Sequence, residues 1–385
     1  MPRHIGLNPP HELILVRMLV TMGAAALVAT SSLYLKSLGL SDGAIGISTG
    51  VVMAINFVFA LSLPLILRRF NLAHLLITST IGFSITLVLF GSVSRAIWAL
   101  FFYVIARLLL SIFSSAYSIL LHDDSQSNRD FQQNQSLSGS LVNFSWMSMP
   151  FIAALIIGEY SFQALYYVAA IIALLSYCLL LIKSVPSRHK PVQKVTSLKH
   201  NFTAYFKRKR LRDAYIVSAG VDIYWVFIFT FVTLFLKDAG YSTATIGVFL
   251  TLNQLPLFLF EYNTYKIVKK YRYRAPFVNS FSFMSFVMLA AAILGLNIVT
   301  LGIFVFTSLF LVFLEPAREM YLYENLESSD EESMQPVYAT AELTGSVLTR
   351  IIVGLLLTVF SQTAGFIFMA LILGAIAFHN RTVED

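Results

Sequence analysis

The chain contains a succession of apolar runs of about 18 or more residues, the length at which an α-helix crosses a lipid bilayer. Short polar segments rich in charged residues, Gly, Pro, Asn or Asp separate these runs. Only 12% of the residues are charged, whereas ordinary globular chains contain roughly 25%. So few charges cannot make a water-facing surface for a chain of 385 residues. The sequence therefore predicts an all-α polytopic membrane protein.

Division of the chain at its polar segments predicts twelve transmembrane helices. They are expected at residues 12–36, 43–67, 73–93, 97–121, 133–157 and 162–183, and again at 213–236, 243–266, 275–296, 299–323, 335–360 and 363–379. A polar, basic segment, 184–212, separates the two sets and reads as a cytoplasmic linker. The predicted domains are an N-terminal six-helix bundle, 1–183, and a C-terminal six-helix bundle, 213–385.

One sequence element occurs twice, 201 positions apart. Residues 33–46 read LYLKSLGLSDGAIG and residues 234–247 read LFLKDAGYSTATIG, with seven of fourteen positions identical. The informative matches are those of polar residues and glycines, at Lys36/Lys237, Gly39/Gly240, Ser41/Ser242 and Gly46/Gly247. In each copy, the first glycine suits a turn with positive φ and the serine suits the N-cap of the next helix. The repeat predicts two pseudo-symmetric bundles related by an axis along the membrane normal.

Lys and Arg residues indicate the orientation, because they concentrate in cytoplasmic loops. With the N-terminus inside, twenty-one of the 27 lie on the cytoplasmic side; the others are Lys36, Arg95 and Lys237 in outer loops and Arg107, Arg318 and Arg350 within spans. Both termini are thus predicted to be cytoplasmic, in a plasma or inner membrane.

The first apolar run has basic residues before it, as a signal peptide has, but it continues into the repeat and is predicted to be a spanning helix. The net charge of +7 suits anionic lipid headgroups and predicts no nucleic-acid partner.

Several kinds of site are excluded by residue type and spacing. The single cysteine, Cys178, allows no disulfide framework, and the seven histidines have no metal-binding spacing. No phosphate-binding loop and no clustered acid, histidine and nucleophile occur. We therefore predict no metal, no cofactor and no enzymatic activity.

With six plus six helices, a basic central loop, cytoplasmic termini and the phrase SLGLSDGAIG, the chain resembles the major facilitator superfamily of secondary transporters. Members often carry G-x-x-x-D-R-x-G-R-R between their second and third helices. Here the stretch is PLILRRFNLA: Arg69 holds the motif's Arg position, while Pro64 and Arg68 replace its Gly and Asp. The resemblance implies a cytoplasmic gate at Arg68 and Arg69. The acidic segment ENLESSDEES is either a solvated loop or a clamp that attracts these arginines.

Two further matches lie on the predicted spans 97–121 and 133–157. Arg107 and Ser111 resemble the R-x-x-x-G of many proton-coupled members, with Ser in place of Gly. The stretch MPFIAA, 149–154, resembles the exporter motif G-P-x-x-G-G. By this resemblance, transport is expected to be proton-coupled, with a lean toward export.

Polar residues within the spans are the candidates for binding and coupling, because an ionised side chain there costs about 2.5 kcal/mol or more. The predicted substrate-binding or coupling residues are Arg107, Asn143, Asp222, Asn253, Gln254, Glu261, Glu315, Arg318, Glu342 and Arg350. Arg107 either anchors a substrate carboxylate or makes a structural ion pair. Asp222 either exchanges protons or hydrogen-bonds between helices. Trp146 lies near Asn143 on the same predicted span and is a further candidate for a cavity wall.

Spacing groups some of these candidates. Gln254 and Glu261 are seven apart and share a helix face, as a pathway lining or a helix–helix seam requires. Glu315 and Arg318 are three apart and can pair, and Glu342 is expected at a similar depth, roughly 12–14 Å from the cytoplasmic side at 1.5 Å per residue. We predict that these three form part of an inner gate or proton path. Arg350 is poorly placed for Glu342, so a substrate or Asp222 is its expected partner.

These patterns favour a monomeric secondary active transporter that moves a small organic solute by alternating access, with protons as the coupling partner. The arginines suggest some anionic character in the solute. Proton-coupled uptake of a sugar, nucleoside or organic acid stays open. So does a receptor or scaffold that binds a solute in the membrane without moving it.

Overall fold

The computed structural model describes residues 9–125, 128–182, 198–326 and 331–383. These residues form helices joined by short turns, and no β-strand occurs among them. Within these ranges, twelve helical spans are long and apolar enough to cross a membrane. The predicted all-α, twelve-span fold is therefore confirmed.

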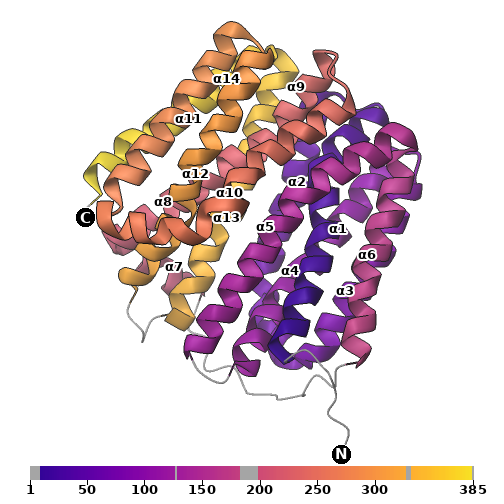
Figure 1. The fold of residues 1–385 in the computed structure, drawn as a ribbon, viewed down its shortest axis with the longest axis vertical. Helices are drawn as coiled ribbons and strands as arrows, with labels where there is room; N and C mark the ends of the chain where they lie inside the picture. The colour runs from indigo at the N-terminus through magenta and orange to yellow at the C-terminus, as the bar shows by residue number, and fades with distance from the viewer. Residues whose placement is uncertain (1–8, 126–127, 183–197, 327–330, 384–385) are drawn as a thin grey trace, which may run out of the picture. The chain divides into compact units, whose positions relative to one another are not determined.

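Six long helices follow one another in the first half of the chain (Figure 1). They are α1 (Pro9–Ser37), α2 (Asp42–Arg69), α3 (Leu72–Ser92), α4 (Ala96–Asp124), α5 (Asn128–Glu159) and α6 (Phe162–Ile182). No boundary differs from the predicted span by more than five residues.

The second half begins with α7 (Leu198–Lys207), which lies inside the predicted linker 184–212. Residues 183–197 of that linker lie outside the described residues. The remaining elements are α8 (Lys209–Val226), the π-helical segment η1 (Phe227–Val232), α9 (Thr233–Asp238), α10 (Thr243–Tyr271), α11 (Arg274–Leu294), α12 (Ile298–Glu324), α13 (Glu331–Val359), α14 (Gln362–His379) and the short 3₁₀ turn η2 (Asn380–Thr382).

The chain packs as two compact units. The first comprises Met1–Ser31 and Val58–Pro191, and the second comprises Ser32–Phe57 and Val192–Asp385. The boundaries fall inside α1 and α2, so the turn that joins these two helices packs with the second unit. The division of the sequence into 1–183 and 213–385 stays a prediction.

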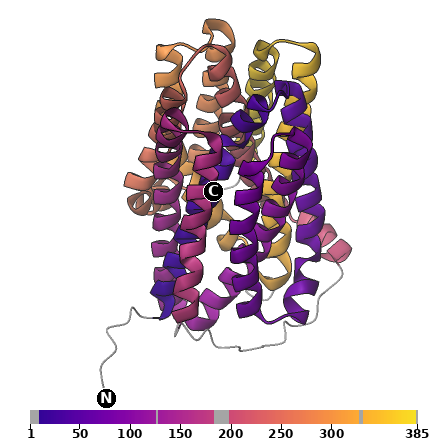
Figure 2. The ribbon, with the colours of Figure 1, turned by 90° about the vertical axis from the view of Figure 1, so that its right-hand side faces the viewer.

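In the first unit, α3 packs along both α4 and α6 (Figure 2). Gly91 of α3 lies against Tyr166 of α6, and the ring of Phe90 meets that of Tyr166 edge-on at 4.8 Å between centroids. The Tyr166 hydroxyl hydrogen-bonds to Thr30 of α1 at 2.9 Å. Small residues at such contacts let helices approach closely. Close van der Waals packing of this kind drives helix association in lipid, where the hydrophobic effect does not.

In the second unit, α8, η1 and α9 form one span, Lys209–Asp238, that is buried along almost its whole length. This span packs against α12, α13 and α14. The six residues of η1, FIFTFV, are all buried. Their hydropathy does not distinguish this π-helical segment from an ordinary α-helix. The Thr233 hydroxyl donates to the carbonyls of Phe229 and Thr230, and such bonds to the preceding turn distort helix geometry.

The internal repeat recurs in the structure. The first helix of each copy ends, and the second begins, at positions 201 apart: Ser37 and Asp42 in one copy, Asp238 and Thr243 in the other. Gly39 has φ of 91° and Gly240 has φ of 84°, a region that favours glycine. Both helices close with backbone bonds of the Schellman type, from Gly39 to Lys36 and from Gly240 to Lys237. The predicted positive-φ turns are confirmed.

The two serines of the repeat cap the following helices as predicted. The Ser41 hydroxyl accepts the backbone amide of Ala44 at 3.3 Å, and the Ser242 hydroxyl accepts that of Thr245 at 3.1 Å. Each serine thereby satisfies one of the amides that a helix start leaves without an intrahelical partner.

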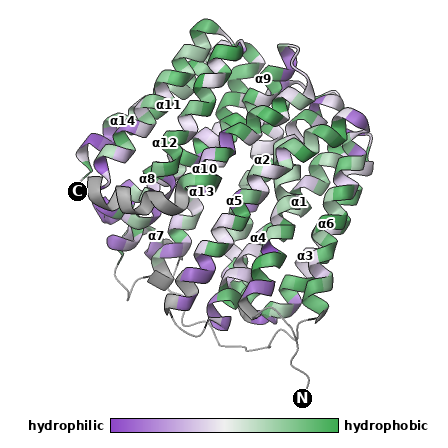
Figure 3. Ribbon diagram, viewed as in Figure 1, coloured by the Kyte–Doolittle hydropathy of each residue, from purple (hydrophilic) through white to green (hydrophobic). Residues whose placement is uncertain are grey.

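Hydropathy along the helices fits a bilayer (Figure 3). Hydrophobic residues dominate the middle of the helices, and hydrophilic residues gather toward their ends. Large apolar side chains lie exposed on these helices, among them Ile97, Ile293 and Leu371, which are at least 68% exposed. Exposure of this kind suits lipid rather than water, so the protein is a multi-pass membrane protein.

We predict that Gly91→Leu destabilises the protein by about 1–3 kcal/mol, the usual effect of overpacking. A Cβ at Gly91 would lie 2.8 Å from the Cβ of Tyr166. Gly302, on α12, is the matched control, because a Cβ there meets nothing within 4 Å. The thermal unfolding midpoint in detergent should fall for Gly91→Leu and not for Gly302→Leu, and equal midpoints would contradict this packing.

Candidate functional site

The second unit gathers charged side chains from α12 and α13 around one guanidinium. Arg318 Nη2 lies 2.9 Å from Glu315 Oε2 and 3.3 Å from Glu342 Oε1. Arg318 Nε lies 3.8 Å from Glu319 Oε1. We call Glu315, Arg318, Glu319 and Glu342 the acid–arginine cluster. The structure brings together the three residues that the sequence grouped, and their role stays a prediction.

Neutral side chains hold this cluster in place. Trp225 Nε1, from α8, donates to Glu315 Oε1 at 2.9 Å. Arg318 Nη1 donates to the Ser218 hydroxyl of α8 at 3.3 Å, and the Tyr338 hydroxyl of α13 donates to Glu319 at 3.1 Å. Because three helices contribute, a shift of any one of them changes the partners of the charges.

Exposure divides the cluster into a buried pair and an accessible pair. The side chains of Arg318 and Glu315 are 13% and 14% exposed, whereas those of Glu319 and Glu342 are 45% and 55% exposed. Three carboxylates share one guanidinium, so the cluster is formally negative when all are ionised. It can therefore accept a proton or a cationic group while Arg318 keeps a carboxylate partner.

Local sequence explains the geometry of α12. Glu315 and Arg318 are three residues apart, which places them on one helix face. Pro316 stands between them inside the helix and cannot donate a backbone hydrogen bond. In a spanning helix such a proline is tolerated where neighbouring groups replace the lost bond, and it makes this turn easier to deform.

Two more candidates lie on α8 and α13. Asp222 lies beside Gly345, where a Cβ would be 3.3 Å from the Cβ of Asp222. Arg350 is buried, and its guanidinium donates to the hydroxyl of Ser346, one turn earlier on α13. The expected Arg350–Asp222 pair stays a prediction.

The part of this interface nearest α7 is also polar. The Tyr215 hydroxyl of α8 is 3.1 Å from that of Thr340 and 2.7 Å from that of Thr344 on α13. Tyr205 of α7 is buried and meets Tyr215 edge-on. Burial raises the pKa of the Tyr205 phenol, so this group stays neutral at physiological pH.

The candidates on α10 behave as parts of a helix contact. Asn253 is fully buried, donates to the Phe249 carbonyl at 2.9 Å and accepts from Ser308 of α12 at 3.4 Å. Gln254 is also buried. These bonds favour the helix–helix seam for Asn253. The side chains of Glu261 and Arg68 lie outside the described residues, and Arg69 is exposed at the end of α2.

In the first unit, Arg107 lies half-buried on α4. Its Nε is buried and has no hydrogen-bond partner among the described residues, and no described carboxylate makes an ion pair with it. The role of Arg107, as an anchor for a substrate or as a structural residue, stays a prediction. Asn143 and Trp146 lie half-buried on α5 of the same unit.

Arg17 is a candidate that the sequence analysis missed. Its guanidinium carbon lies 4.8 Å from the ring centre of Tyr117, and its Nη1 donates to the Ser138 hydroxyl at 3.2 Å. Tyr117 and Ser138 hydrogen-bond to each other at 2.8 Å, so the group links α1, α4 and α5. Arg17 was assigned to the cytoplasmic side because it lies near the start of the first span. Its depth of several residues inside that span was the available signal.

The chain is similar to known proteins both in its sequence family and in its fold. A family model described as Major Facilitator Superfamily matches residues 13–329. No curated protein matches the chain. Among solved structures, a POT family transporter in complex with a thioalcohol-conjugated peptide is similar with a TM-score of 0.80 and 12% identity, covering 96% of this chain and 94% of that one.

Two other solved structures share the fold. A mutant of the nucleoside transporter NupG matches with a TM-score of 0.78 and 14% identity, covering 96% of this chain and 98% of that one. A bacterial homolog of the human lysosomal transporter Spinster, inward-facing and unoccupied, matches with a TM-score of 0.76 and 12% identity over 98% of each chain. Identities this low show a common fold.

We predict that Arg318 and Glu315 are energetically coupled, because both side chains are largely buried and their ion pair, at 2.9 Å, is the shortest in the cluster. Arg318→Gln and Glu315→Gln should be non-additive by about 0.5–3 kcal/mol in a double-mutant cycle on unfolding. The cycle of Arg318→Gln with Glu342→Gln is the internal control, and its coupling should be smaller because Glu342 is 55% exposed. Equal couplings would contradict the division into buried and accessible pairs.

Proposed function

The chain belongs to the Major Facilitator Superfamily, and on this premise we propose that it is a secondary active transporter of a small organic solute. Alternating access through rocking of helix bundles is the mechanism that such repeats support. The observation that carries the proposal is the family match over residues 13–329 together with twelve candidate spans among the described residues. By the distribution of Lys and Arg, both termini lie in the cytoplasm and the protein resides in the cell membrane.

Proton coupling is assigned to the acid–arginine cluster. Its carboxylates outnumber its guanidinium, and two of them are accessible while one is buried. A proton that reaches the accessible carboxylates weakens their hold on Arg318 and leaves Glu315 as its main partner. The three contributing helices can then change their contacts, which links protonation to a conformational step.

The solute is expected to be small, organic and partly anionic. Arg107 provides a guanidinium without an ion-pair partner among the described residues. Arg350 adds a second positive charge, buried on α13, where it donates to Ser346. Solved structures with this fold include a transporter in complex with a peptide conjugate, another in complex with 5-aminolevulinic acid, and a nucleoside transporter. The exporter-like stretch MPFIAA on α5 favours efflux over uptake.

Counterflow tests transport against binding alone. Purified protein in liposomes preloaded with an unlabelled solute should accumulate the labelled solute transiently, because a carrier exchanges the two across the bilayer. The panel should contain small anions, peptides and nucleosides, and protein-free liposomes are the control. Binding without counterflow would favour a receptor or scaffold.

Glu315→Gln combined with Glu342→Gln should abolish transport driven by a pH gradient, because the cluster then lacks both its buried carboxylate and its most exposed one, and Arg318 keeps only Glu319. The measurement is solute flux in vesicles with an imposed gradient, with counterflow measured in parallel. Glu324→Gln is the matched control, since Glu324 is an exposed carboxylate at the end of the same helix. Undiminished proton coupling in the double variant would remove both residues from the relay.

Arg107→Gln should weaken the transport of anionic solutes more than that of neutral ones. Loss of a charged hydrogen-bond donor from a buried site lowers affinity by roughly tenfold or more. The ratio of KM values for an anionic solute and its neutral amide reports the effect. Arg95→Gln, at an exposed position with no predicted role, is the control, and an unchanged ratio for Arg107→Gln would exclude an anion-anchoring role.

A further inference from the structure

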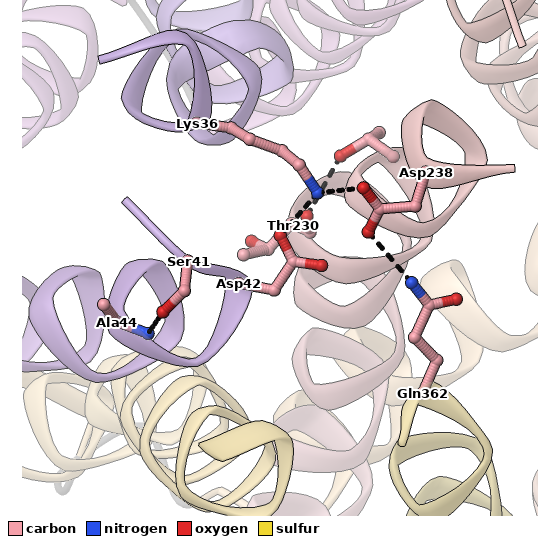
Figure 4. Close-up of polar contacts among 8 residues, drawn as sticks. Lys36, Ser41, Asp42, Ala44, Thr230, Asp238 and Gln362 are labelled. Carbon is pink, nitrogen blue, oxygen red and sulfur yellow. Dashed lines mark hydrogen bonds and ion pairs between the residues drawn. The ribbon is translucent and has the colours of Figure 1, made fainter. Parts of the chain in front are cut away.

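A second charged group lies at the turn between α1 and α2 (Figure 4). Lys36 Nζ, at the end of α1, lies 2.8 Å from Asp42 Oδ1 at the start of α2 and also contacts the carboxylate of Asp238 at the end of α9. Gln362 Nε2, at the start of α14, donates to Asp238 Oδ2 at 3.0 Å. We call Lys36, Asp42, Asp238 and Gln362 the Lys36 latch. All four belong to the second unit.

The latch breaks the symmetry of the repeat. Lys237 is the counterpart of Lys36, 201 residues later, yet it is exposed and makes no ion pair with any described residue. The counterparts of the acidic residues are not acidic: Thr243 corresponds to Asp42, and Ser37 corresponds to Asp238. Of the two repeated lysines, Lys36 therefore has acidic partners, and Lys237 has none among the described residues. Helix-turn geometry common to both copies does not explain this difference.

A seam of glycines continues from the latch along α2. A Cβ at Gly46 would lie 2.6 Å from the Cα of Gly354 on α13, and a Cβ at Gly43 would lie 2.9 Å from the Gly354 carbonyl oxygen. A Cβ at Gly50 would lie 2.6 Å from Ile351. Backbones this close leave no room for water or a solute between α2 and α13. The Lys36 latch thus lies at the end of a tightly packed contact between α2 and α13.

Exposure of the latch suits an interaction that forms and breaks. The side chains of Asp42, Lys36 and Asp238 are 14%, 26% and 38% exposed. Ion pairs at such partly wet positions are modest in strength, so a conformational change can separate them and water can take over the charges. The glycines of the seam carry no side chains that interlock with α13, so this contact can likewise part and close again.

We propose that Lys36 is a positioning residue whose latch closes the predicted outer end of the transport path. With the latch formed, the turn between α1 and α2 is held on α9 and α14, and α2 is sealed against α13. With the latch broken, the seam parts and the path opens on that side. The inference rests on the proposed alternating access and adds the residues that keep one side shut.

The test measures access to a cysteine beneath the latch. In a Cys178→Ser background, Thr49→Cys places a thiol seven residues past Asp42, about 10 Å deeper along α2. Thr49 is buried, and its hydroxyl donates to the carbonyl of Gly46, a glycine of the seam, at 3.3 Å. The labelling rate with a membrane-impermeant maleimide, applied to right-side-out vesicles, then reports how often the seam opens. Size-exclusion profiles confirm that each variant is folded.

Lys36→Met should accelerate this labelling about fivefold, the effect of losing surface ion pairs from the closed state. Lys237→Met, the matched lysine of the other copy, should leave it unchanged. Lys36→Asp combined with Asp238→Lys exchanges the two charges, so one ammonium still lies among two carboxylates. This double variant should restore slow labelling. These three results together support the latch.

The proposal is overturned if Lys36→Met labels at the parent rate, or if Lys237→Met accelerates labelling equally. Acceleration only in inside-out vesicles would also overturn the assignment to the outer end. Counterflow on the parent protein tests the proposed function separately. Counterflow with unchanged labelling would reject the latch alone, and accelerated labelling without counterflow would reject transport alone.

Discussion

The absence of water from the bilayer core is the constraint on which the rest of this structure depends. A charge within a span has to find its partner inside the protein, because lipid offers none. Arg318 meets this requirement with carboxylates from its own helix and from α13. Arg17 meets it differently, with the face of Tyr117 and the Ser138 hydroxyl. Polar contacts between spans are therefore few and specific, and each ties together helices that have to move as one or separate.

The same constraint explains what the sequence could predict. Bilayer thickness sets the length of each apolar run, so twelve spans and their ends within five residues follow from hydropathy and turn residues alone. Helical spacing placed Glu315 beside Arg318, and depth counted from the helix ends brought Glu342 to them. The turns at Gly39 and Gly240 followed from the repeat, because only a glycine accepts that φ without strain.

The features that were missed depend on which helices lie side by side, and one-dimensional patterns do not contain that information. The Trp225–Glu315 bond joins residues 90 positions apart, and the Lys36–Asp238 contact joins residues 202 positions apart. Lys36 was identified as part of the repeat, but its acidic partners, Asp42 and Asp238, have no acidic counterparts in the repeat. The repeat therefore gave no sign of the ion pairs. The π-helical turn η1 was also missed, since its residues are as apolar as any helix. Asn253, predicted as a substrate-binding or coupling residue, hydrogen-bonds to Phe249 and Ser308, and its role stays a prediction.

The acid–arginine cluster of the second unit has carboxylates that differ in their exposure, and this difference bears on the proton coupling proposed for it. In the acid–arginine cluster, the carboxylates at the accessible side outnumber the buried one, so a proton arriving from water meets Glu319 or Glu342 before Glu315. The Trp225 indole of α8 donates to Glu315, which itself pairs with Arg318, so Glu315 joins α8 to α12. In the proposed function, this buried carboxylate is the one whose release would free α8 from α12, and a change in its partners would link proton uptake to helix motion.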